Sequence, residues 1–172
     1  DSRSGKLLFT VPGYVVNSGQ EMLARLSPLS PDGSKLLTRT HDQHFRVWHA
    51  DSGKEMFSLQ IANSVQLGPL VDPYWPAFSA DGSRIVFVNY ERGQSVGQSM
   101  EFVFRVFDAN KGVELYSFRD SRIVMPWPTF SPDGTRLLAG GRMIDVRTGA
   151  DVAGFRALED HGRSAPGFSP DG

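Results

Sequence analysis

Short runs of apolar and aromatic residues alternate along the whole chain with Asp-Gly, Ser-Gly and Gly-Gly pairs. Runs of about four to eight residues between such turn signals predict β-strands. Residues 84–89 and 100–107 are two examples, and both are rich in β-branched and aromatic side chains. The pattern therefore predicts an all-β protein that is built from short strands.

One turn phrase recurs four times, as Ser-Pro-Asp-Gly or Ser-Ala-Asp-Gly. A small residue, a cation and an apolar run follow each of the first three copies. Asp can bond its own backbone at such a turn, and Gly supplies the positive φ of a tight reversal. We therefore assign a structural role to the Asp and Gly of all four copies, which are Asp32, Gly33, Asp81, Gly82, Asp133, Gly134, Asp171 and Gly172.

A second phrase ends in glycine and alternates with the first along the chain. Its four glycines are Gly5, Gly53, Gly112 and Gly149. An Arg followed by two apolar residues precedes the last three copies, at Arg46, Arg105 and Arg142. Each repeat unit therefore contains four strands, called a to d. Strand a precedes the Asp-Gly turn, strand b follows it, strand c carries the Arg, and strand d follows the second glycine.

The units recur at intervals of about 38 to 52 residues, which suits propeller-type repeats. One unit cannot bury its own apolar faces, so neighbouring units must stack. We expect residues 1–172 to form one repeat array, with complete units at roughly 22–59, 75–118 and 127–155, one leading strand d and one trailing strand a. A closed ring needs about four to eight units. We therefore expect a segment of a longer polypeptide whose remaining units are its neighbours. Because its edges are unpaired, we expect the isolated segment to be poorly soluble or to self-associate.

The pattern resembles the WD-repeat family of β-propellers, most closely over residues 46–54 with Ser-Pro-Asp-Gly upstream. The resemblance covers nearly the whole chain and implies a β-propeller fragment of about three four-stranded blades. His49 stands where the family carries the Asp of its Trp-Asp pair, and Phe107 and Ile144 replace the Trp in the next two units. Asp42 occupies the position of the family's turn aspartate, but the histidine that usually accompanies it is missing.

Composition narrows the classes of partner. The chain has 18 Lys and Arg against 19 Asp and Glu, a net charge of −1, which argues against a nucleic-acid binder and a polybasic membrane surface. No apolar stretch approaches the roughly 18 residues of a membrane span, and no signal peptide is visible, so a soluble, cytoplasmic protein is the default expectation. The absence of cysteine excludes disulfides, thiol catalysis and zinc-thiolate sites.

One short motif matches the spacing of a hydrolase nucleophile elbow, with Ser95 at its centre in residues 93–97. That motif needs a strand before the serine and a helix after it. Here a β-branched and aromatic run follows, at residues 100–107, and aligns with strand c of the other units. Ser95 is therefore assigned to the hairpin loop between strands b and c.

A group of histidines could suggest a metal site, because His41, His44 and His49 lie near Asp42. Three imidazoles and a carboxylate are a plausible ligand set. However, His44 and His49 are five residues apart on one strand, so their side chains point to opposite faces. We therefore expect turn and surface residues here, and no metal site or cofactor.

The remaining charged residues also follow the repeat. The recurrent Arg46, Arg105 and Arg142 mark one register on strand c, and we expect them to lie along the unit surfaces or to pair with turn carboxylates. The recurring Asp residues serve equivalent turns, so they provide no catalytic pair. The sequence accordingly predicts a protein that is not an enzyme.

Loop lengths differ between the units, and in repeat scaffolds insertions often fall on the binding face. The d–a connections 12–25 and 60–74 and the b–c loop 91–99 are long. In the propeller geometry that the resemblance implies, these loops emerge on one face. The candidate partner-binding residues on this rim, of types enriched at interaction hot spots, are Tyr14, Tyr74, Tyr90 and Arg92.

The favoured interpretation is a non-enzymatic scaffold that presents this loop-built face to a protein or peptide partner. One alternative is a sensor or substrate-gating propeller attached to a catalytic module elsewhere in the parent chain. A third is an enzymatic propeller with a site in its channel, which needs converging polar side chains on the inner strands. The sequence places Pro, Ala, Thr, Gly and Phe there instead.

Overall fold

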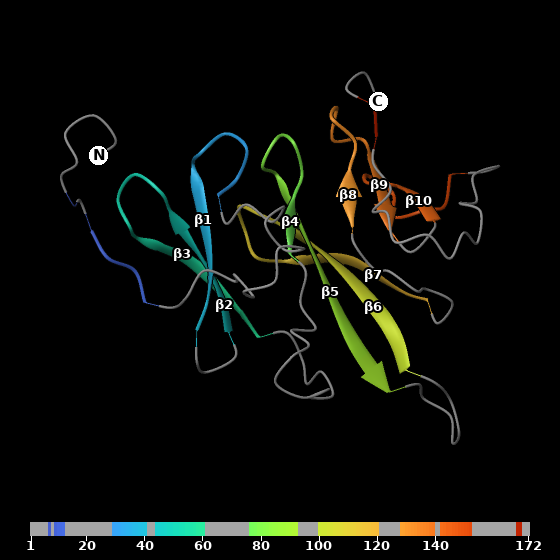
Figure 1. The fold of residues 1–172 in the computed structure, drawn as a ribbon, viewed down its shortest axis with the longest axis horizontal. Helices are drawn as coiled ribbons and strands as arrows, with labels where there is room; N and C mark the ends of the chain where they lie inside the picture. Colours follow the sequence, from blue (N-terminus) through green and yellow to red (C-terminus); the bar gives the residue numbers. More distant parts are fainter. Residues whose placement is uncertain are drawn as a thin grey trace.

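The computed structural model of the 172-residue chain describes residues 7, 9–12, 29–40, 44–60, 76–92, 100–120, 128–139, 142–152 and 168–169. Within these ranges all regular structure is β-strand and no helix occurs, as the sequence predicts. Figure 1 shows the strands, whose bounds are β1 (Lys35–Arg39), β2 (His44–His49), β3 (Glu55–Gln60), β4 (Ala77–Phe78), β5 (Arg84–Arg92), β6 (Met100–Asp108), β7 (Glu114–Asp120), β8 (Thr129–Phe130), β9 (Arg136–Ala139) and β10 (Arg142–Asp145).

The strands form three separate antiparallel sheets, one for each repeat unit. Their orders are β1-β2-β3, β4-β5-β6-β7 and β10-β9-β8. The second sheet is a complete a-b-c-d blade. An isolated bridge from Leu29 to Leu36 supplies the strand-a position of the first sheet, and a bridge from Ile144 to Asp151 supplies the strand-d position of the third. We call the sheets blades 1, 2 and 3; the blade limits 22–59, 75–118 and 127–155 stay a prediction.

The Asp-Gly turns between strands a and b are equivalent in all three blades. Each glycine has a positive φ between 66° and 71°. In each copy its N–H donates to the carbonyl of the serine that opens the turn, at N···O distances of 2.8–2.9 Å. The fourth copy, Asp171 and Gly172, lies outside the described residues. Local turn chemistry therefore sets the same corner in every described blade.

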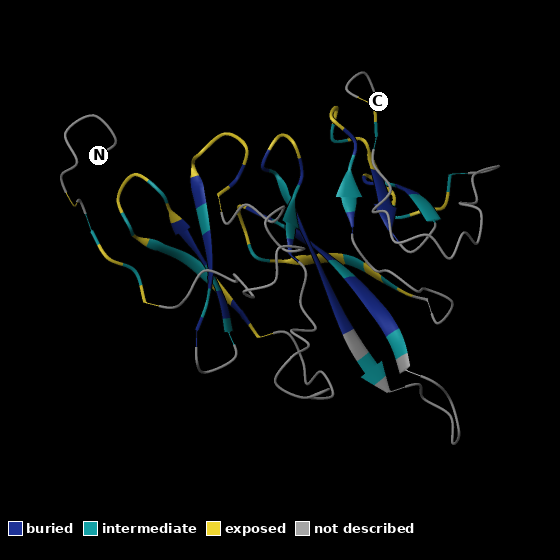
Figure 2. Ribbon diagram, viewed as in Figure 1, coloured by how far each residue is buried: buried dark blue, intermediate teal, exposed yellow. Residues whose placement is uncertain are grey.

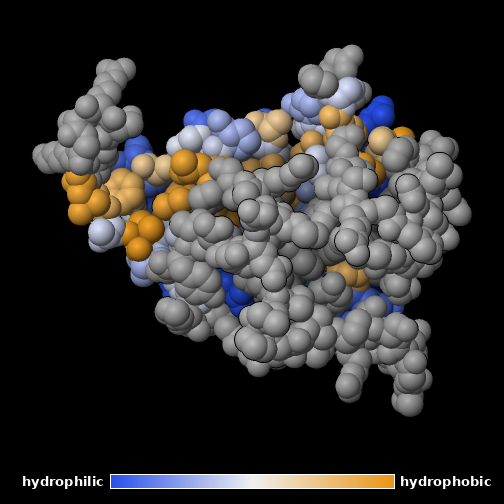
Figure 3. Space-filling view, viewed as in Figure 1, coloured by the Kyte–Doolittle hydropathy of each residue, from blue (hydrophilic) through white to orange (hydrophobic). Residues whose placement is uncertain are grey.

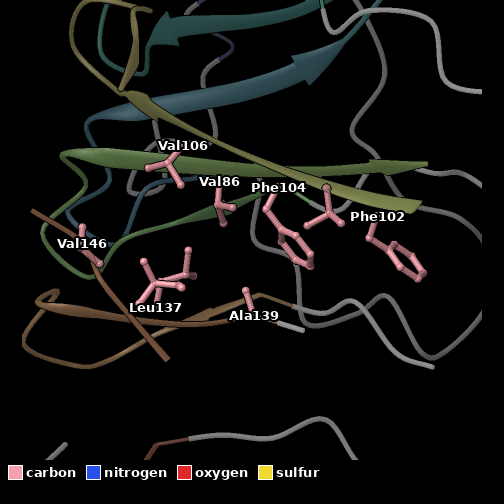
Figure 4. Packing of buried hydrophobic residues seen from close by; sticks show 9 residues of the cluster. Val86, Phe102, Phe104, Val106, Leu137, Ala139 and Val146 are labelled. Atoms are coloured by element: carbon pink, nitrogen blue, oxygen red, sulfur yellow. The ribbon is translucent and has the colours of Figure 1, made fainter. Parts of the chain in front are cut away.

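The core lies between the blades rather than inside any one of them. Side chains alternate along β5, so Ile85 and Phe87 face blade 1 whereas Val86 and Val88 face blade 3. The first interblade cluster contains Leu37, Phe45, Val47 and Leu59 of blade 1 with Ile85, Phe87, Phe107 and Ala109 of blade 2. The second contains Val86, Val88, Phe102, Phe104 and Val106 of blade 2 with Leu137, Ala139, Ile144 and Val146 of blade 3. Figure 4 shows this second cluster, and Figure 2 shows that burial is concentrated in the central strands.

Successive sheets that pack face to face through apolar clusters are the stacking expected of propeller blades. The equivalent turns, the a-b-c-d order and the two interblade clusters together give an all-β fragment of a propeller-type fold. Each fully buried aliphatic or aromatic side chain contributes about 1.5–3 kcal/mol to such a core. Blade 2 is the only described blade with a cluster on each face, so its strands carry the longest buried runs.

An aromatic ring from the preceding part of the chain lies over the second-phrase glycine of each described blade. A Cβ placed on Gly112 would lie only 2.6 Å from Cδ2 of Phe57, and a Cβ on Gly53 only 2.4 Å from Cδ2 of Phe9. The equivalent Gly149 lies beneath Tyr116, at 2.9 Å. These three aromatic–glycine contacts link successive blades and require a residue without a side chain at the c–d turn.

The hairpin of strands b and c is longest in blade 2. Strands β5 and β6 have nine residues each. In comparison, β1 and β2 have five and six, and β9 and β10 have four each. Figure 1 shows the β5–β6 hairpin extending beyond the strands of the other two blades. In Figure 3, hydrophilic atoms lie along the upper edge of the molecule, where the a–b turns are found.

Candidate functional site

The sequence-predicted rim residues are only partly placed by the structure. Tyr14 and Tyr74 lie outside the described residues. Tyr90 and Arg92 belong to the last three residues of β5, where the backbone pairs Tyr90 with Phe102 and Arg92 with Met100. Their side chains are not described, so their role in partner binding stays a prediction. The loop serine Ser95 also lies outside the described part of the chain, as do His41 and Asp42.

The connections of blade 2 leave from one edge, which we call the b–c edge. The pairing of Arg92 with Met100 places the end of β5 and the start of β6 there. The pairing of Phe102 with Asp120 places the end of β7 at the same edge. The b–c loop and the d–a connection of this blade therefore emerge together, which is the arrangement that the resemblance implied.

Charged side chains brace the extended β5–β6 hairpin close to this edge. Glu91 and Glu101 lie directly opposite each other on the two strands. Like charges in that position are destabilising unless a cation lies between them. Arg119 of β7 supplies the cation, because its Nη2 donates to Oε2 of Glu91 at 2.6 Å and its Nη1 donates to Oε2 of Glu101 at 3.4 Å.

A second arginine approaches Glu91 from within β6. Nη2 of Arg105 donates to Oε1 of Glu91 at 2.9 Å, and Nδ2 of Asn89 donates to the same oxygen at 3.2 Å. Nη1 of Arg105 also contacts Oε2 of Glu114, at 3.3 Å. We call these six residues, Asn89, Glu91, Glu101, Arg105, Glu114 and Arg119, the hairpin network.

The electrostatics of the hairpin network favour a fixed, ionised arrangement. Burial would raise the pKa of Glu91, but the hydrogen bonds from Arg105, Arg119 and Asn89 outweigh it and lower that pKa below its ordinary value. The ionic side chains keep 17–37% of their surface exposed, so each ion pair contributes no more than about 1 kcal/mol. The network therefore positions the hairpin and holds Glu91 as a carboxylate.

The recurrent arginines of strand c each pair with an acidic residue at the strand-d position of the same blade. Arg46 contacts Glu55 at 3.1 Å, and Arg142 contacts Asp151 at 2.8 Å. Arg105 makes the corresponding contact with Glu114, as described above. In each blade the acidic residue stands two positions after the second-phrase glycine, which is a signal that sequence inspection could have used.

Arg142 also has a contact across the blade boundary. Its guanidinium lies over the Phe118 ring of blade 2, with Cζ 4.8 Å from the ring centroid. Phe118 in turn stacks on Phe104, with centroids 4.8 Å apart and planes inclined by 7°. This arginine therefore helps to align blades 2 and 3, and it is not available for binding an anion.

The turn aspartates accept hydrogen bonds within their own turns in the three described copies. Hydrogen bonds from Ser131 and Thr135 lower the pKa of Asp133 to about 2. The equivalent serine contacts lower the pKa of Asp32. At Asp81 burial acts to raise the pKa, but hydrogen bonds from Ser79 and Ser83 reverse that effect and lower it.

Within the described ranges, no three His, Cys, Asp or Glu residues gather in an arrangement suited to a metal ion. His44 and His49 occupy opposite ends of β2, paired with Gln60 and Lys35 respectively. In the same ranges, no helix could span a bilayer. Among the described residues, the hairpin network is therefore the main polar cluster at the b–c edge.

Comparison with known proteins gives structural neighbours only. The sequence matches no protein-family model. No curated protein matches it either. Among solved structures, the chain is similar to BamB from Moraxella catarrhalis, with a TM-score of 0.49 and 21% identity over 72% of this chain and 34% of that one.

Two further similar structures are those of the RRP9 WD40 repeats and of U3-55K. Each has a TM-score of 0.49 and 17% identity, and covers 72% of this chain and 36% of the other. The chain thus spans about a third of the length of the structures it matches. The assignment of the fold rests on the sheet order, the equivalent turns and the interblade packing described above.

Proposed function

We propose that this chain is part of a WD-repeat-like propeller that acts as a non-enzymatic scaffold and presents its b–c edge to a partner protein or peptide. The observation that supports the proposal is the extended β5–β6 hairpin with its network of ion pairs. The other described blades have shorter b–c hairpins. In repeat scaffolds, elements that extend beyond the common repeat often form the binding face.

The hairpin network gives the projection a fixed direction. A two-stranded hairpin alone is marginally stable in water. Arg119 ties both strands of this hairpin to β7, and Arg105 ties β5 to the body of the blade. A binding element that is ordered beforehand loses less conformational entropy when its partner binds. Tyr90 and Arg92, at the end of the hairpin, are residue types that anchor interfaces.

The described carboxylates give no support to an enzymatic role. The turn aspartates accept hydrogen bonds from neighbouring hydroxyl and N–H groups. Glu91 is shared between two arginines. Groups that are saturated in this way are poor general bases, because hydrogen bonds to the charged form lower their proton affinity.

To test the proposal, the 172-residue chain is immobilised and incubated with extracts of its source organism. The bound proteins are then quantified by mass spectrometry. The double variant Tyr90→Ala/Arg92→Ala is expected to reduce capture of a specific partner by about tenfold or more, as loss of a hot spot does. A matched control is Lys111→Ala, an exposed residue of a c–d turn at the opposite edge. If every protein is retained equally by parent, double variant and control, the b–c edge is not the binding face.

A further inference from the structure

The three described a–b turns contain Asp-Gly pairs, which have a chemistry of their own. In a flexible chain, glycine leaves its backbone nitrogen free to attack the Asp side chain, since it has no Cβ to obstruct the approach. The glycine nitrogen loses its proton and bonds to Asp Cγ, one carboxyl oxygen leaves as water, and a succinimide ring forms. Addition of water to either ring carbonyl then gives aspartate or isoaspartate, so the mass of the chain is unchanged.

The folded turn engages the attacking nitrogen. The N–H of Gly33 donates to the carbonyl oxygen of Ser30 at 2.8 Å. The N–H of Gly134 donates in the same way to Ser131, at 2.8 Å. Gly82 repeats the contact with Ser79 at 2.9 Å. The nitrogen must break this bond before it can turn towards Cγ.

The folded turn also holds the carboxylate by three donors. At Asp133, the hydroxyl of Ser131 donates to Oδ1 at 2.5 Å, the N–H of Thr135 donates to Oδ1 at 3.0 Å, and the hydroxyl of Thr135 donates to Oδ2 at 2.8 Å. The same three contacts recur at Asp32 and Asp81. Both oxygens are therefore engaged by the serine and by the residue two positions on.

Ionisation adds to this protection. Succinimide formation expels a carboxyl oxygen as water, which a protonated carboxyl releases more readily than a carboxylate. The hydrogen bonds that lower the pKa of Asp133 to about 2 make its protonated fraction at neutral pH smaller than that of an ordinary aspartate. Asp32 and Asp133 are exposed, so water can reach an opened turn.

We infer that Asp32, Asp81 and Asp133 are latent isomerisation sites, which the folded a–b turn keeps closed and which open when the turn unfolds. The opening is local because the protecting donors all lie within five residues of the aspartate. Isoaspartate places an extra methylene in the main chain, so the Ser131 N–H to Arg136 carbonyl bond that closes the turn cannot re-form in register. Isoaspartate that forms while the chain is unfolded therefore remains at these turns afterwards.

Neighbouring turns are close enough for one modified turn to affect the next. A Cβ on Gly82 would lie 3.3 Å from Oδ1 of Asp32, and a Cβ on Gly134 would lie 3.8 Å from Oδ1 of Asp81. A displaced carboxylate in one blade thus meets the corner of the following blade. Isomerisation of Asp32 or Asp81 is expected to loosen the adjacent turn as well.

The experiment incubates the 172-residue chain at neutral pH and 37 °C, folded or in urea, and quantifies isoaspartate by electron-transfer fragmentation. The three sites fall on different tryptic peptides, which end at Lys35, Arg84 and Arg136. We expect the folded chain to form isoaspartate at least about tenfold more slowly than the unfolded chain at all three sites, since a local opening must precede reaction. Asp145, which precedes Val146, is the internal control and stays unmodified in both states.

Two variants test the named contacts. Thr135→Ala removes the one carboxylate contact made by the exposed threonine hydroxyl, and Ser131→Ala removes the buried serine hydroxyl. Each is expected to accelerate isomerisation at Asp133 by about tenfold, the effect of losing one hydrogen bond to a charged group, while Asp32 is unchanged. Thr148→Ala, in the c–d turn of the same blade, is the matched control and leaves Asp133 unchanged.

Circular dichroism on each variant separates local from global opening. If Ser131→Ala unfolds the chain, all three sites accelerate together, and Thr135→Ala then carries the local test. Equal rates in the folded and unfolded parent chains would overturn the inference. A folded Thr135→Ala variant with the parent rate at Asp133 would also overturn it.

Discussion

Two sets of glycines occupy equivalent-looking turns, but they are required for different reasons. Gly33 in the a–b turn and Gly112 in the c–d turn have nearly the same φ, 71° and 69°. A Cβ on Gly33 would meet nothing within 4 Å, whereas a Cβ on Gly112 would lie 2.6 Å from the Phe57 ring. The turn at Gly33 needs only a left-handed backbone. The second also needs empty space, because the preceding blade fills it with an aromatic ring.

The largest expected effect is the difference in the free energy of unfolding that is lost when the glycine of each turn is replaced by alanine. Gly33→Ala introduces only left-handed strain, and is expected to lower the free energy of unfolding by about 1–2 kcal/mol. Gly112→Ala adds overpacking against Phe57, for a total loss of about 2–5 kcal/mol. Urea unfolding of the two variants beside the parent chain measures both. Equal losses would show that the ring moves aside freely and that the two glycines are equivalent.

A double-mutant cycle sharpens the same comparison. Phe57→Ala removes the ring, so it should relieve the clash that Gly112→Ala creates. The destabilisation by Gly112→Ala is expected to be about 1–2 kcal/mol smaller in the Phe57→Ala background than in the parent, as for residues in direct contact. Gly33→Ala in the same background is the matched control and keeps its full effect. An additive result at Gly112 would mean that the contact has no energetic consequence.

The sequence predicts the turns well because their chemistry is local. Serine, aspartate and glycine within four residues form the a–b corner from their own hydrogen bonds, so the pattern carries its structure wherever it occurs. The all-β class and the side-by-side repeat follow from those corners. The aromatic–glycine contacts could not be predicted this way, because Phe57 and Gly112 are far apart in sequence and meet only through blade stacking.

Differences in side-chain contacts between the blades also could not be predicted from the local sequence pattern. In blade 1, Nε1 of Trp48 donates to Oγ1 of Thr38 at 2.9 Å. In blade 2, Phe107 and Phe87 occupy the two equivalent positions and meet edge to face, with centroids 5.6 Å apart. Blade 2 has neither the tryptophan nor the hydroxyl that the tryptophan binds in blade 1, so an apolar pair stands where blade 1 has a polar one. Reading one strand alone shows only a degenerate repeat.

The rim was the least predictable part of the candidate site. The long loops 12–25 and 60–74 share no phrase with the repeat, so the sequence gives their length but not their conformation. The hairpin network was missed because its members come from three strands and only their pairing brings them together. Glu91 and Arg119 are an example, since β5 and β7 are separated by β6 in the sheet.

Acid should destabilise the a–b corners selectively. The folded-state pKa of Asp133 lies near 2, below its ordinary value of 3.8. The stability that its ionised form contributes is therefore complete above about pH 4 and is lost as the pH falls towards 2. Urea unfolding between pH 2 and pH 6 measures the free energy of unfolding of the parent chain and of Asp133→Asn. The difference between the two chains should be constant near pH 6 and should vanish as the pH approaches 2. If this difference in free energy does not depend on pH, the ionised carboxylate of Asp133 does not stabilise the turn.

The smallest expected effect concerns the one aromatic–glycine contact that has a polar group. The hydroxyl of Tyr116 donates to the carbonyl oxygen of Val146 in blade 3, at 3.2 Å, whereas Phe57 has no such group. Tyr116→Phe should keep the ring over Gly149 and lower the free energy of unfolding by about 1 kcal/mol. Burial raises the pKa of Tyr116 to about 12, so the folded state favours the neutral phenol, and its contribution to stability is lost as the pH rises from 10 towards 12. Alkaline unfolding of the parent and Tyr116→Phe chains should therefore converge in this range. If the two chains differ by the same amount at pH 8 and pH 12, the hydroxyl does not link the blades and the ring alone does.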